Sequence, residues 1–295
     1  MDFVRLKELS EQYRIEKRGK DQLLPGLTIL RRSAPSDLEA SIYEPVICLI
    51  LQGSKTTSIG DQTVDVGPGW ALLVSHDLPV VSRITQASAR EPYLAVILSL
   101  DLQVVHGLAN QVSIAPSPGM SAKSLSASPA QSSWVEPLIR YLELMHHPLD
   151  AKILGPSFFR EIHYRLMLAP IGTGLRNLLI ADGHAARVAK AISQLRSAYR
   201  DTIKIPDLAR VAGMSESSFH EHFKSVTGTT PLQYQKDLRL IEARILLTAR
   251  NSTVAETAHA VGYESPTQFS RDYSRKFGLP PSRDGEIDRL SASAH

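Results

Sequence analysis

Cys48 is the residue of this chain with the strongest intrinsic reactivity, because a thiolate is a nucleophile and a metal ligand. It is the one cysteine among 295 residues and stands inside the apolar run 46–51. We expect a small buried residue in a strand, since free cysteine packs as a hydrophobe. The alternative is a thiol sensor of electrophiles or oxidants. That role requires an exposed thiolate of low pKa, and Lys55 would have to approach it through the fold.

Three further side chains, those of His76, Arg83 and Tyr93, could line a ligand cavity, or could equally be surface or core residues. A metal-dependent barrel needs several histidines with a carboxylate on facing strands. Between residues 27 and 100, however, His76 is the only histidine. The sequence also lacks paired carboxylates, a nucleophile elbow and a phosphate-binding loop. We therefore expect no metal, no cofactor and no enzymatic activity.

The segment that must position these side chains has the pattern of strands. Between residues 27 and 100, short apolar runs alternate with glycine, proline and aspartate turns. Their spacing of about 8–12 residues is typical of a β-sandwich or barrel. Gly60 and Asp61 predict a tight hairpin, because glycine readily adopts the positive φ that such turns require.

The next segments change character twice. Residues 113–133 are rich in serine, alanine and proline, which predicts a loop. Residues 134–181 predict helices, with one apolar stripe beginning at Trp134 and another at Phe158. These stripes could bury against a partner subunit or, equally, against the β domain of the same chain.

An internal repeat with an offset of 49 to 50 residues is the strongest pattern in the sequence. In each copy a glycine (Gly213, Gly262) ends one helix and a serine (Ser215, Ser265) caps the next. Two aromatic residues four positions apart then seat the second helix on the core and leave its other face free. These pairs are Phe219 with Phe223 and Phe269 with Tyr273. Each copy therefore predicts a helix-turn-helix unit.

A long helix joins the two copies. Residues 232–249 predict a rod of about 27 Å, preceded by a proline at the first helical position. A rigid connection fixes the distance between the two units. Second helices about 34 Å apart would meet successive major-groove turns on one face of DNA.

These motifs resemble the AraC/XylS family of bacterial transcription regulators. In the C-terminal half the resemblance is carried by Gly213-Met214-Ser215, Phe219, Phe223-Lys224, Thr227-Gly228, Pro231, Tyr234, Val261-Gly262-Tyr263 and Phe277-Gly278. The N-terminal half is similar to a subgroup with a cupin-like regulatory domain, through Glu44-Pro45, Gln52-Gly53-Ser54-Lys55, Asp77-Leu78-Pro79-Val80 and Glu91-Pro92-Tyr93.

The resemblance implies an α+β fold of several domains. A cupin-like β-barrel or sandwich with following helices would precede an all-α domain of two helix-turn-helix units joined by a long helix. The expected parts are a regulatory domain (1–112), a loop (113–133), a helical dimerisation or linker segment (134–181), a DNA-binding domain (182–284) and a flexible tail (285–295). The implied partners are double-stranded promoter DNA, RNA polymerase, a small effector and a second copy of the chain.

In this family, base contacts come from the exposed first turns of the two recognition helices. The matching positions are Ser217, His220, Glu221, Thr267, Gln268 and Arg271. Arg271 suits guanine and Gln268 suits adenine. Glu221 stands where the family usually has arginine; a carboxylate accepts from cytosine N4 but repels phosphate. Expected phosphate contacts are Lys224, Arg275 and Lys276.

The distribution of charge agrees with an anionic partner for the C-terminal half. Residues 1–175 carry a net charge of −1, and residues 176–295 carry +4. With no secretory signal and no apolar run of about 20 residues, we expect a cytoplasmic location in a bacterium.

Two alternatives stay open at the level of sequence. A DNA-binding domain could be fused to a thiol-based sensor or alkyl acceptor at Cys48, although its apolar surroundings argue against an activated thiolate. An architectural DNA binder without sequence preference would need stronger basicity than this chain has.

Overall fold

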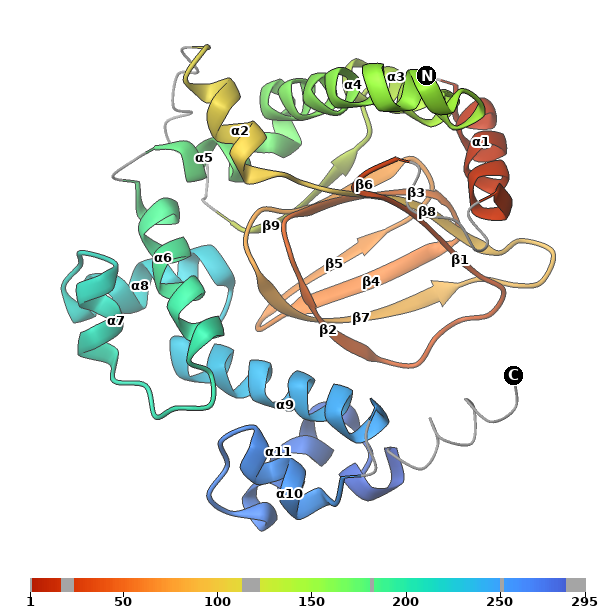
Figure 1. Cartoon of the computed structure of the whole chain (residues 1–295). Coiled ribbons are helices and arrows are strands. Elements are labelled where there is room, and N and C mark those ends of the chain that lie inside the picture. The colour runs from red at the N-terminus through yellow and green to blue at the C-terminus, as the bar shows by residue number, and fades with distance from the viewer. Residues whose placement is uncertain (1, 17–23, 113–122, 181–182, 250–251, 285–295) are drawn as a thin grey trace.

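The N-terminal half is built from two antiparallel sheets that face each other (Figure 1). A computed structural model describes residues 2–16, 24–112, 123–180, 183–249 and 252–284. The five-stranded sheet has the order β1 (Leu27–Arg32), β8 (Tyr93–Ser99), β3 (Val46–Gln52), β6 (Trp70–Val74) and β9 (Leu125–Pro129). The four-stranded sheet has the order β2 (Glu39–Tyr43), β7 (Leu78–Gln86), β4 (Ser54–Ile59) and β5 (Gln62–Val66).

Strand β3 shows why the run 46–51 is apolar throughout. Ile47 and Leu49 face a helical layer, whereas Cys48 and Ile50 face the space between the sheets. A sheet covered on both faces has no solvent side, so its strands need no polar alternation. The helical layer consists of α1 (Phe3–Glu16), α3 (Ser132–Glu143) and α4 (Pro148–Leu168).

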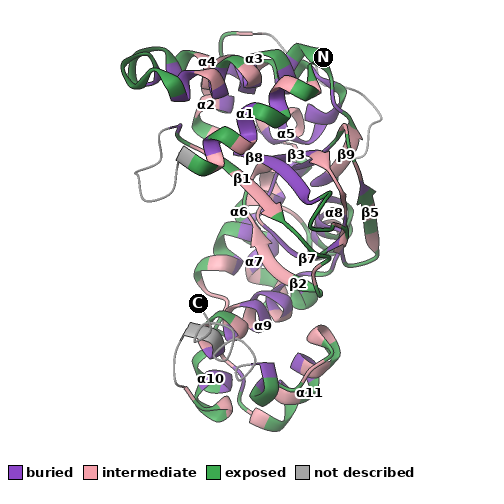
Figure 2. Cartoon of the chain, turned by 90° about the vertical axis from the view of Figure 1, so that its right-hand side faces the viewer, coloured by how far each residue is buried: buried purple, intermediate pink, exposed green. Residues whose placement is uncertain are grey.

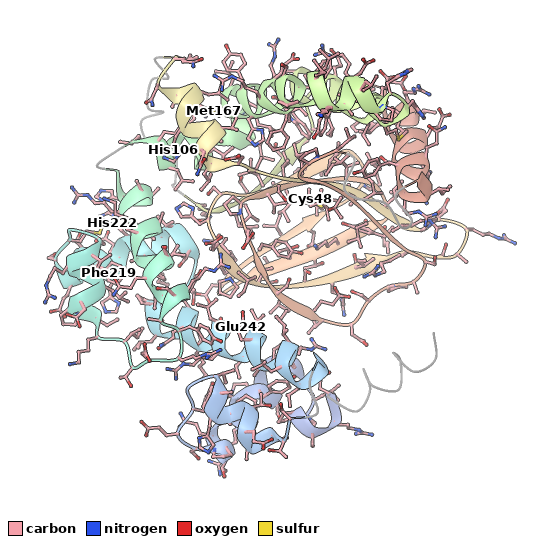
Figure 3. All side chains as sticks on the ribbon, in the orientation of Figure 1. Cys48, His106, Met167, Phe219, His222 and Glu242 are labelled. Carbon is pink, nitrogen blue, oxygen red and sulfur yellow. The ribbon has the colours of Figure 1, made fainter. Side chains whose placement is uncertain are left out.

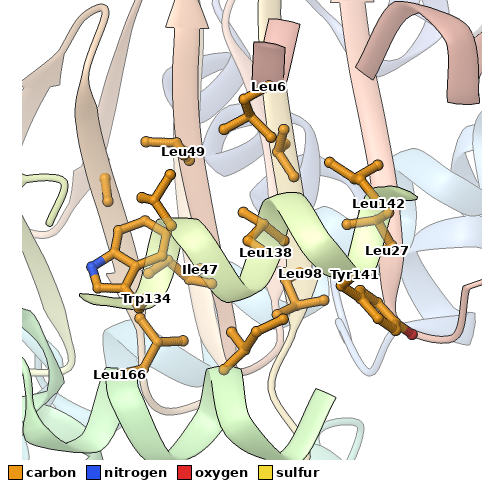
Figure 4. Packing of buried hydrophobic residues seen from close by; sticks show 14 of the residues in the cluster. Leu6, Leu27, Ile47, Leu49, Leu98, Trp134, Leu138, Tyr141, Leu142 and Leu166 are labelled. Atoms are coloured by element: carbon orange, nitrogen blue, oxygen red, sulfur yellow. The ribbon is translucent and has the colours of Figure 1, made fainter. Parts of the chain in front are cut away.

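The two apolar stripes predicted for residues 134–181 pack on this sheet. Trp134 and Leu138 of α3, together with Ile162 and Leu166 of α4, share one buried cluster with strand residues such as Leu98. Figure 4 shows Trp134 and Leu138 lying over the strands. Of the two possibilities left open by the sequence, the stripes bury against their own chain.

Three elements differ from the sequence-based expectations. Residues 125–129, predicted as loop, form strand β9, which pairs with β6 from Leu125 opposite Val74 to Pro129 opposite Trp70. Backbone hydrogen bonds to β6 hold this edge strand. Its side chains are mostly small, so the sequence shows no apolar pattern that would predict a strand. Helices α1 and α2 (Leu102–Ala109) were also not predicted. Residues 113–122 of the predicted loop and the predicted tail, 285–295, lie outside the described residues.

The predicted hairpin is confirmed. Ile59 of β4 pairs with Gln62 of β5, which leaves Gly60 and Asp61 as the turn. Gly60 has a φ of 52°, in the left-handed region that favours glycine. A Cβ at this position would lie 2.1 Å from the carbonyl oxygen of Gly228, so the hairpin tip lies directly against the C-terminal half.

The C-terminal half is helical. After α5 (Thr173–Leu179) and two 3₁₀ turns (Leu144–His146, Pro170–Gly172) come α6 (His184–Ser197), α7 (Ile205–Val211), α8 (Glu216–Thr227), α9 (Pro231–Ala249), α10 (Val254–Ala260) and α11 (Pro266–Phe277). The pairs α7–α8 and α10–α11 are the two predicted helix-turn-helix units, and α9 is the predicted long connection (Figure 1).

The turn chemistry of both units is as predicted. Gly213 and Gly262 have φ values of 63° and 87°. The hydroxyls of Ser215 and Ser265 accept hydrogen bonds from backbone amides of α8 and α11. A reciprocal capping box stands at the start of α10, between Thr253 and Glu256.

The first unit and the sandwich share one hydrophobic core. Ile50 and Val80 of the sheets belong to the same buried cluster as Leu195 of α6, Phe219 of α8 and Leu238 of α9. The second unit instead has its own cluster, which includes Phe269 and Tyr273 of α11 and the C-terminal half of α9. Figure 2 shows this second unit on the far side of α9 from the sandwich. The first helix-turn-helix unit is therefore packed on the sandwich, whereas the second is packed on the C-terminal half of α9.

Candidate functional site

Helix α8 presents a polar face to solvent. Ser217, His220 and Glu221 are exposed, as is Lys224 one turn further along. Phe219 and Phe223 on the opposite face are fully buried. The aromatic pair therefore seats the helix as the sequence predicts, and the polar face is accessible to a macromolecule.

Helix α11 presents a second polar face of the same design. Thr267, Gln268 and Arg271 are exposed, while Phe269 and Tyr273 are buried. Within the described part of the chain, no hydrogen bond or ion pair engages the guanidinium of Arg271. That guanidinium therefore keeps its full hydrogen-bonding capacity for a partner.

The three predicted phosphate-binding cations have different surroundings. Lys224 is exposed, and Arg275 is exposed beside Asp272 at 3.5 Å. The ammonium of Lys276 instead lies 2.7 Å from the carboxylate of Asp237, and only 11% of its side chain is exposed. A contact between Lys276 and phosphate would require this ion pair to open.

Two crossed ion pairs hold α11 on α9. Asp237 of α9 pairs with Lys276 of α11, and Lys236 of α9 pairs with Asp272 of α11 at 2.8 Å. Sequence reasoning missed both pairs, although the adjacent, oppositely charged residues 236 and 237 were a signal. These pairs set how α11 is presented relative to the long helix.

The segment after α11 docks through Asp284, a residue that the sequence did not single out. Its buried carboxylate accepts a hydrogen bond from the Tyr273 hydroxyl at 2.8 Å and lies 3.0 Å from Arg244 Nε of α9. This buried carboxylate holds the end of the described chain on α9 and α11.

His76 lies at the junction of the two halves. Its Nε2 is 3.2 Å from the carbonyl oxygen of Ala185 in α6, and its Nδ1 is 2.9 Å from the hydroxyls of Ser75 and Ser124. Burial lowers the pKa of His76 to about 4, although the bond to Ala185 opposes the shift. The ring is therefore neutral at physiological pH and joins the sandwich to α6.

Arg196 of α6 makes the second polar contact of this junction. Its guanidinium lies 2.7 Å from the carboxylate of Asp77 and 3.2 Å from that of Glu44, both in the sandwich. The Tyr234 hydroxyl of α9 donates to the Asp77 carbonyl oxygen at 2.6 Å. Ion pairs at such partly exposed positions are individually weak, so the shared core carries most of the adhesion.

A cavity of ≈ 680 Å³ opens beside this junction. It is lined by strand residues of the sandwich, by Arg196 of α6, and by Ile241, Glu242 and Ile245 of α9. Figure 3 shows Cys48 between the sheets and Glu242 on the part of α9 that lies next to the sandwich. Residues of both halves therefore line this cavity.

The four predicted sensor residues are not brought together as one site. Cys48 lines the cavity, and Tyr93 is buried beside it. His76 is part of the junction with α6, and Arg83 is exposed on β7. Lys55, named in the sequence only as a cation that might approach Cys48, lines the cavity with its ammonium bonded to the Tyr43 hydroxyl.

Cys48 has the surroundings of a core residue. It is 4% exposed, and burial raises the pKa of its thiol although Lys55 and Tyr93 oppose the shift. A raised pKa disfavours the thiolate that a sensor or alkyl acceptor needs. Among the described residues no group of three or more histidines, cysteines, aspartates and glutamates could hold a metal ion.

Both halves match known protein families. Residues 23–173 match the family described as AraC-type transcriptional regulator N-terminus, and residues 208–285 match a helix-turn-helix domain family. The chain is 26% identical over 244 residues to the transcriptional regulator ExsA of Pseudomonas aeruginosa, across 81% of this chain and 85% of ExsA. It is 34% identical over 123 residues to the transcriptional activator RclR of Escherichia coli, across 42% of this chain and 43% of RclR.

Solved structures of ToxT from Vibrio cholerae share the fold. One, bound to (E)-4-(8-methylnaphthalen-1-yl)but-3-enoic acid, has a TM-score of 0.57 at 12% identity and covers 88% of this chain and 98% of ToxT. Another, bound to an unsaturated fatty acid, has a TM-score of 0.53 at 11% identity. The prediction of a sheet-rich domain followed by helix-turn-helix units is thereby confirmed. None of the described helices is long and apolar enough to cross a bilayer.

We expect the folded state to lose stability as the pH falls from about 6.5 towards 4. His76 binds a proton near pH 6.5 when unfolded and near pH 4 when folded, so the unfolded state binds more protons in this window. The full difference corresponds to about 3 kcal/mol. His76→Gln should flatten the dependence of unfolding free energy on pH, measured by urea titration. His106→Gln, on the exposed surface of α2, is the matched control and should leave the slope unchanged.

We expect Cys48 to react slowly with a thiol reagent in the native protein and at once after unfolding. The cause is burial of a thiol whose pKa is raised. Reaction with 5,5′-dithiobis(2-nitrobenzoate), followed by absorbance with and without denaturant, measures the ratio of rates. Similar rates in both states would favour the thiol-sensor alternative.

Proposed function

Because the chain belongs to the AraC-type transcriptional regulators, we propose that α8 and α11 read adjacent major grooves of promoter DNA under the control of a small effector. The observation that carries the proposal is the pair of exposed polar faces on two helix-turn-helix units joined by α9. A helix of 19 residues is about 28 Å long, so α9 acts as a rigid connection that fixes the separation of the two units.

The exposed residues of α8 and α11 differ in chemistry, so the two helices would contribute unequally to DNA affinity. On α11, Arg271 would donate two hydrogen bonds to guanine O6 and N7, Gln268 would pair with adenine, and Thr267 would contact a base edge. On α8, Ser217 and His220 would contact bases, while Glu221 would accept from cytosine N4 and repel the backbone. We therefore assign more of the affinity to α11, with Lys224 and Arg275 on phosphates.

The regulatory half would act through the shared junction. The first unit shares the sandwich core, whereas the second has a separate core and is held by α9, by ion pairs to α9 and by packing of Gly262 against Arg200. A small effector in the cavity beside α9 would change how the second unit is held relative to the first. ToxT, which shares the fold, was solved with small carboxylic acids bound, and this supports a small-molecule effector here. RNA polymerase at the promoter is the further partner that we expect.

Replacing Arg271 tests the proposed reading of DNA. Arg271→Ala should weaken binding to a footprinted site upstream of the gene by about 5-fold to 150-fold, since a bidentate contact to guanine discriminates by about 1–3 kcal/mol. Gel-shift titration at fixed salt measures the change, with unrelated DNA of equal length as competitor. Arg83→Ala, an exposed arginine on β7, is the matched control and should bind as wild type. Wild-type affinity of Arg271→Ala would contradict the assignment.

We propose that two copies of the chain associate through the exposed apolar residues of α4. Leu149 and Ile153 lie one helical turn apart and are 80% and 70% exposed, with Leu154 beside them. An apolar patch on an otherwise polar helix surface is typical of a protein interface.

A charged residue placed in the patch tests the association. Ile153→Glu should convert a dimer to a monomer in light scattering coupled to gel filtration, because a carboxylate cannot be buried there without a partner. Val4→Glu, an exposed position on α1, is the control. A wild-type protein that is monomeric at tens of micromolar would refute the proposal.

A further inference from the structure

The interior of the sandwich contains a buried ammonium without a carboxylate partner. Lys55 of β4 is 6% exposed, and its Nζ donates to the Tyr43 hydroxyl, which lies 3.2 Å from the Ser82 hydroxyl. Among the described residues no carboxylate lies within ion-pair distance of Lys55. An ammonium has three N–H donors, and Tyr43 accepts one. Two donors therefore remain for whatever occupies the cavity that Lys55 lines.

Two further hydroxyls are buried in the same interior. The hydroxyl oxygen of Thr57 makes no hydrogen bond, and that of Tyr93 lies against the Cys48 thiol. Thr57 follows Lys55 by two residues on the inward face of β4, and Tyr93 lies beside Cys48 on the inner face of the facing sheet. Neither residue lines the cavity itself; they stand behind its lining residues Lys55 and Cys48 and add polar character to that side of the interior.

The rest of the cavity is suited to an apolar body. Leu30, Ile84 and Ile97 line it from the sandwich, and Ile241 and Ile245 line it from α9. Its volume of ≈ 680 Å³ lies within the range of about 300–1,000 Å³ that small-molecule sites occupy.

The charges around the cavity restrict the polar group that fits. Arg32 and Arg196 are at the lining together with three glutamates, Glu39, Glu44 and Glu242. Arg196 is already engaged by Asp77 and Glu44. The glutamates repel a doubly charged headgroup such as a phosphate monoester, whereas a single negative charge is balanced by Lys55.

We propose that this cavity binds an apolar monocarboxylate, whose carboxylate accepts hydrogen bonds from Lys55 Nζ and whose body extends to Ile241 and Ile245 of α9. The inference rests on the proposed function in one respect: it takes this cavity as the effector site. Beyond that function, it names the chemical class of the effector and assigns its selection to Lys55. Since α9 joins the two helix-turn-helix units, the bound molecule would contact the element that sets their relative position.

The test uses the full chain and decanoate as the probe, with decanamide as the neutral compound of equal length. Isothermal titration should give binding of decanoate at least ten-fold tighter than that of decanamide. Lys55→Met keeps the length of the side chain and removes its charge, and it should weaken decanoate at least ten-fold while leaving decanamide unchanged. Equal affinities of the two probes for the wild-type chain would overturn the proposal.

Lys152→Met is the matched control, because Lys152 is an exposed lysine that lines a separate apolar groove beside α4. It should bind decanoate as wild type does. Loss of decanoate binding in Lys152→Met but not in Lys55→Met would place the ligand in that other groove and overturn the proposal. Decyl phosphate binding as tightly as decanoate would overturn the choice of a singly charged headgroup.

A second variant keeps the test decisive if Lys55→Met fails to fold. Ile97→Trp leaves Lys55 in place and fills part of the apolar lining, so it should also weaken decanoate at least ten-fold. Gel shifts without ligand check that each variant still binds DNA. DNA binding with no preference for decanoate would defeat this inference alone, whereas decanoate binding without specific DNA binding would defeat the proposed function alone.

Discussion

The shared hydrophobic core between the sandwich and the first helix-turn-helix unit is the interaction on which the rest of the structure depends. Val80 of β7 and Phe223 of α8 belong to one buried cluster, so the inner faces of the sheets and the core of the first unit are continuous. Burial of apolar area is non-directional and large in sum, and here it joins two halves that the sequence presents as separate. The polar contacts of His76 and Arg196 then select one orientation among those that the apolar contact allows.

This arrangement makes the two units of the repeat mechanically different. The first unit cannot move without exposing core surface of the sandwich, whereas the second has its own cluster and is attached through α9, Lys236 and Lys276. The cavity lies where α9 meets the sheets, between the fixed part and the tethered part. A ligand there would contact α9 and the sheets together, so its binding energy could favour one arrangement of the two over another.

Local sequence patterns predicted most of the helices and strands, but they predicted fewer of the side-chain contacts at the candidate sites. The apolar runs gave the strands, and the glycine–serine turns with aromatic pairs gave both helix-turn-helix units, because these signals arise within a few residues of one another. Strand β9 was missed since serine and alanine carry no apolar signal and the strand exists through pairing with β6. The exposure of Arg271 follows from the repeat, which places it on the free face of α11, whereas the engagement of Lys276 by Asp237 was not visible from spacing.

The sequence by itself determined the elements, the repeat and the identity of the exposed polar faces, since each follows from periodicity, turn chemistry and capping over short distances. Only the tertiary structure decided which side chains share an environment. It buried Cys48, left Lys55 with no carboxylate of the described residues within ion-pair distance, separated Arg83 and His76 from the cavity, and joined the first unit to the sandwich. The reason is physical: burial and the pairing of charges depend on contacts between residues far apart in the chain, and no local pattern encodes them.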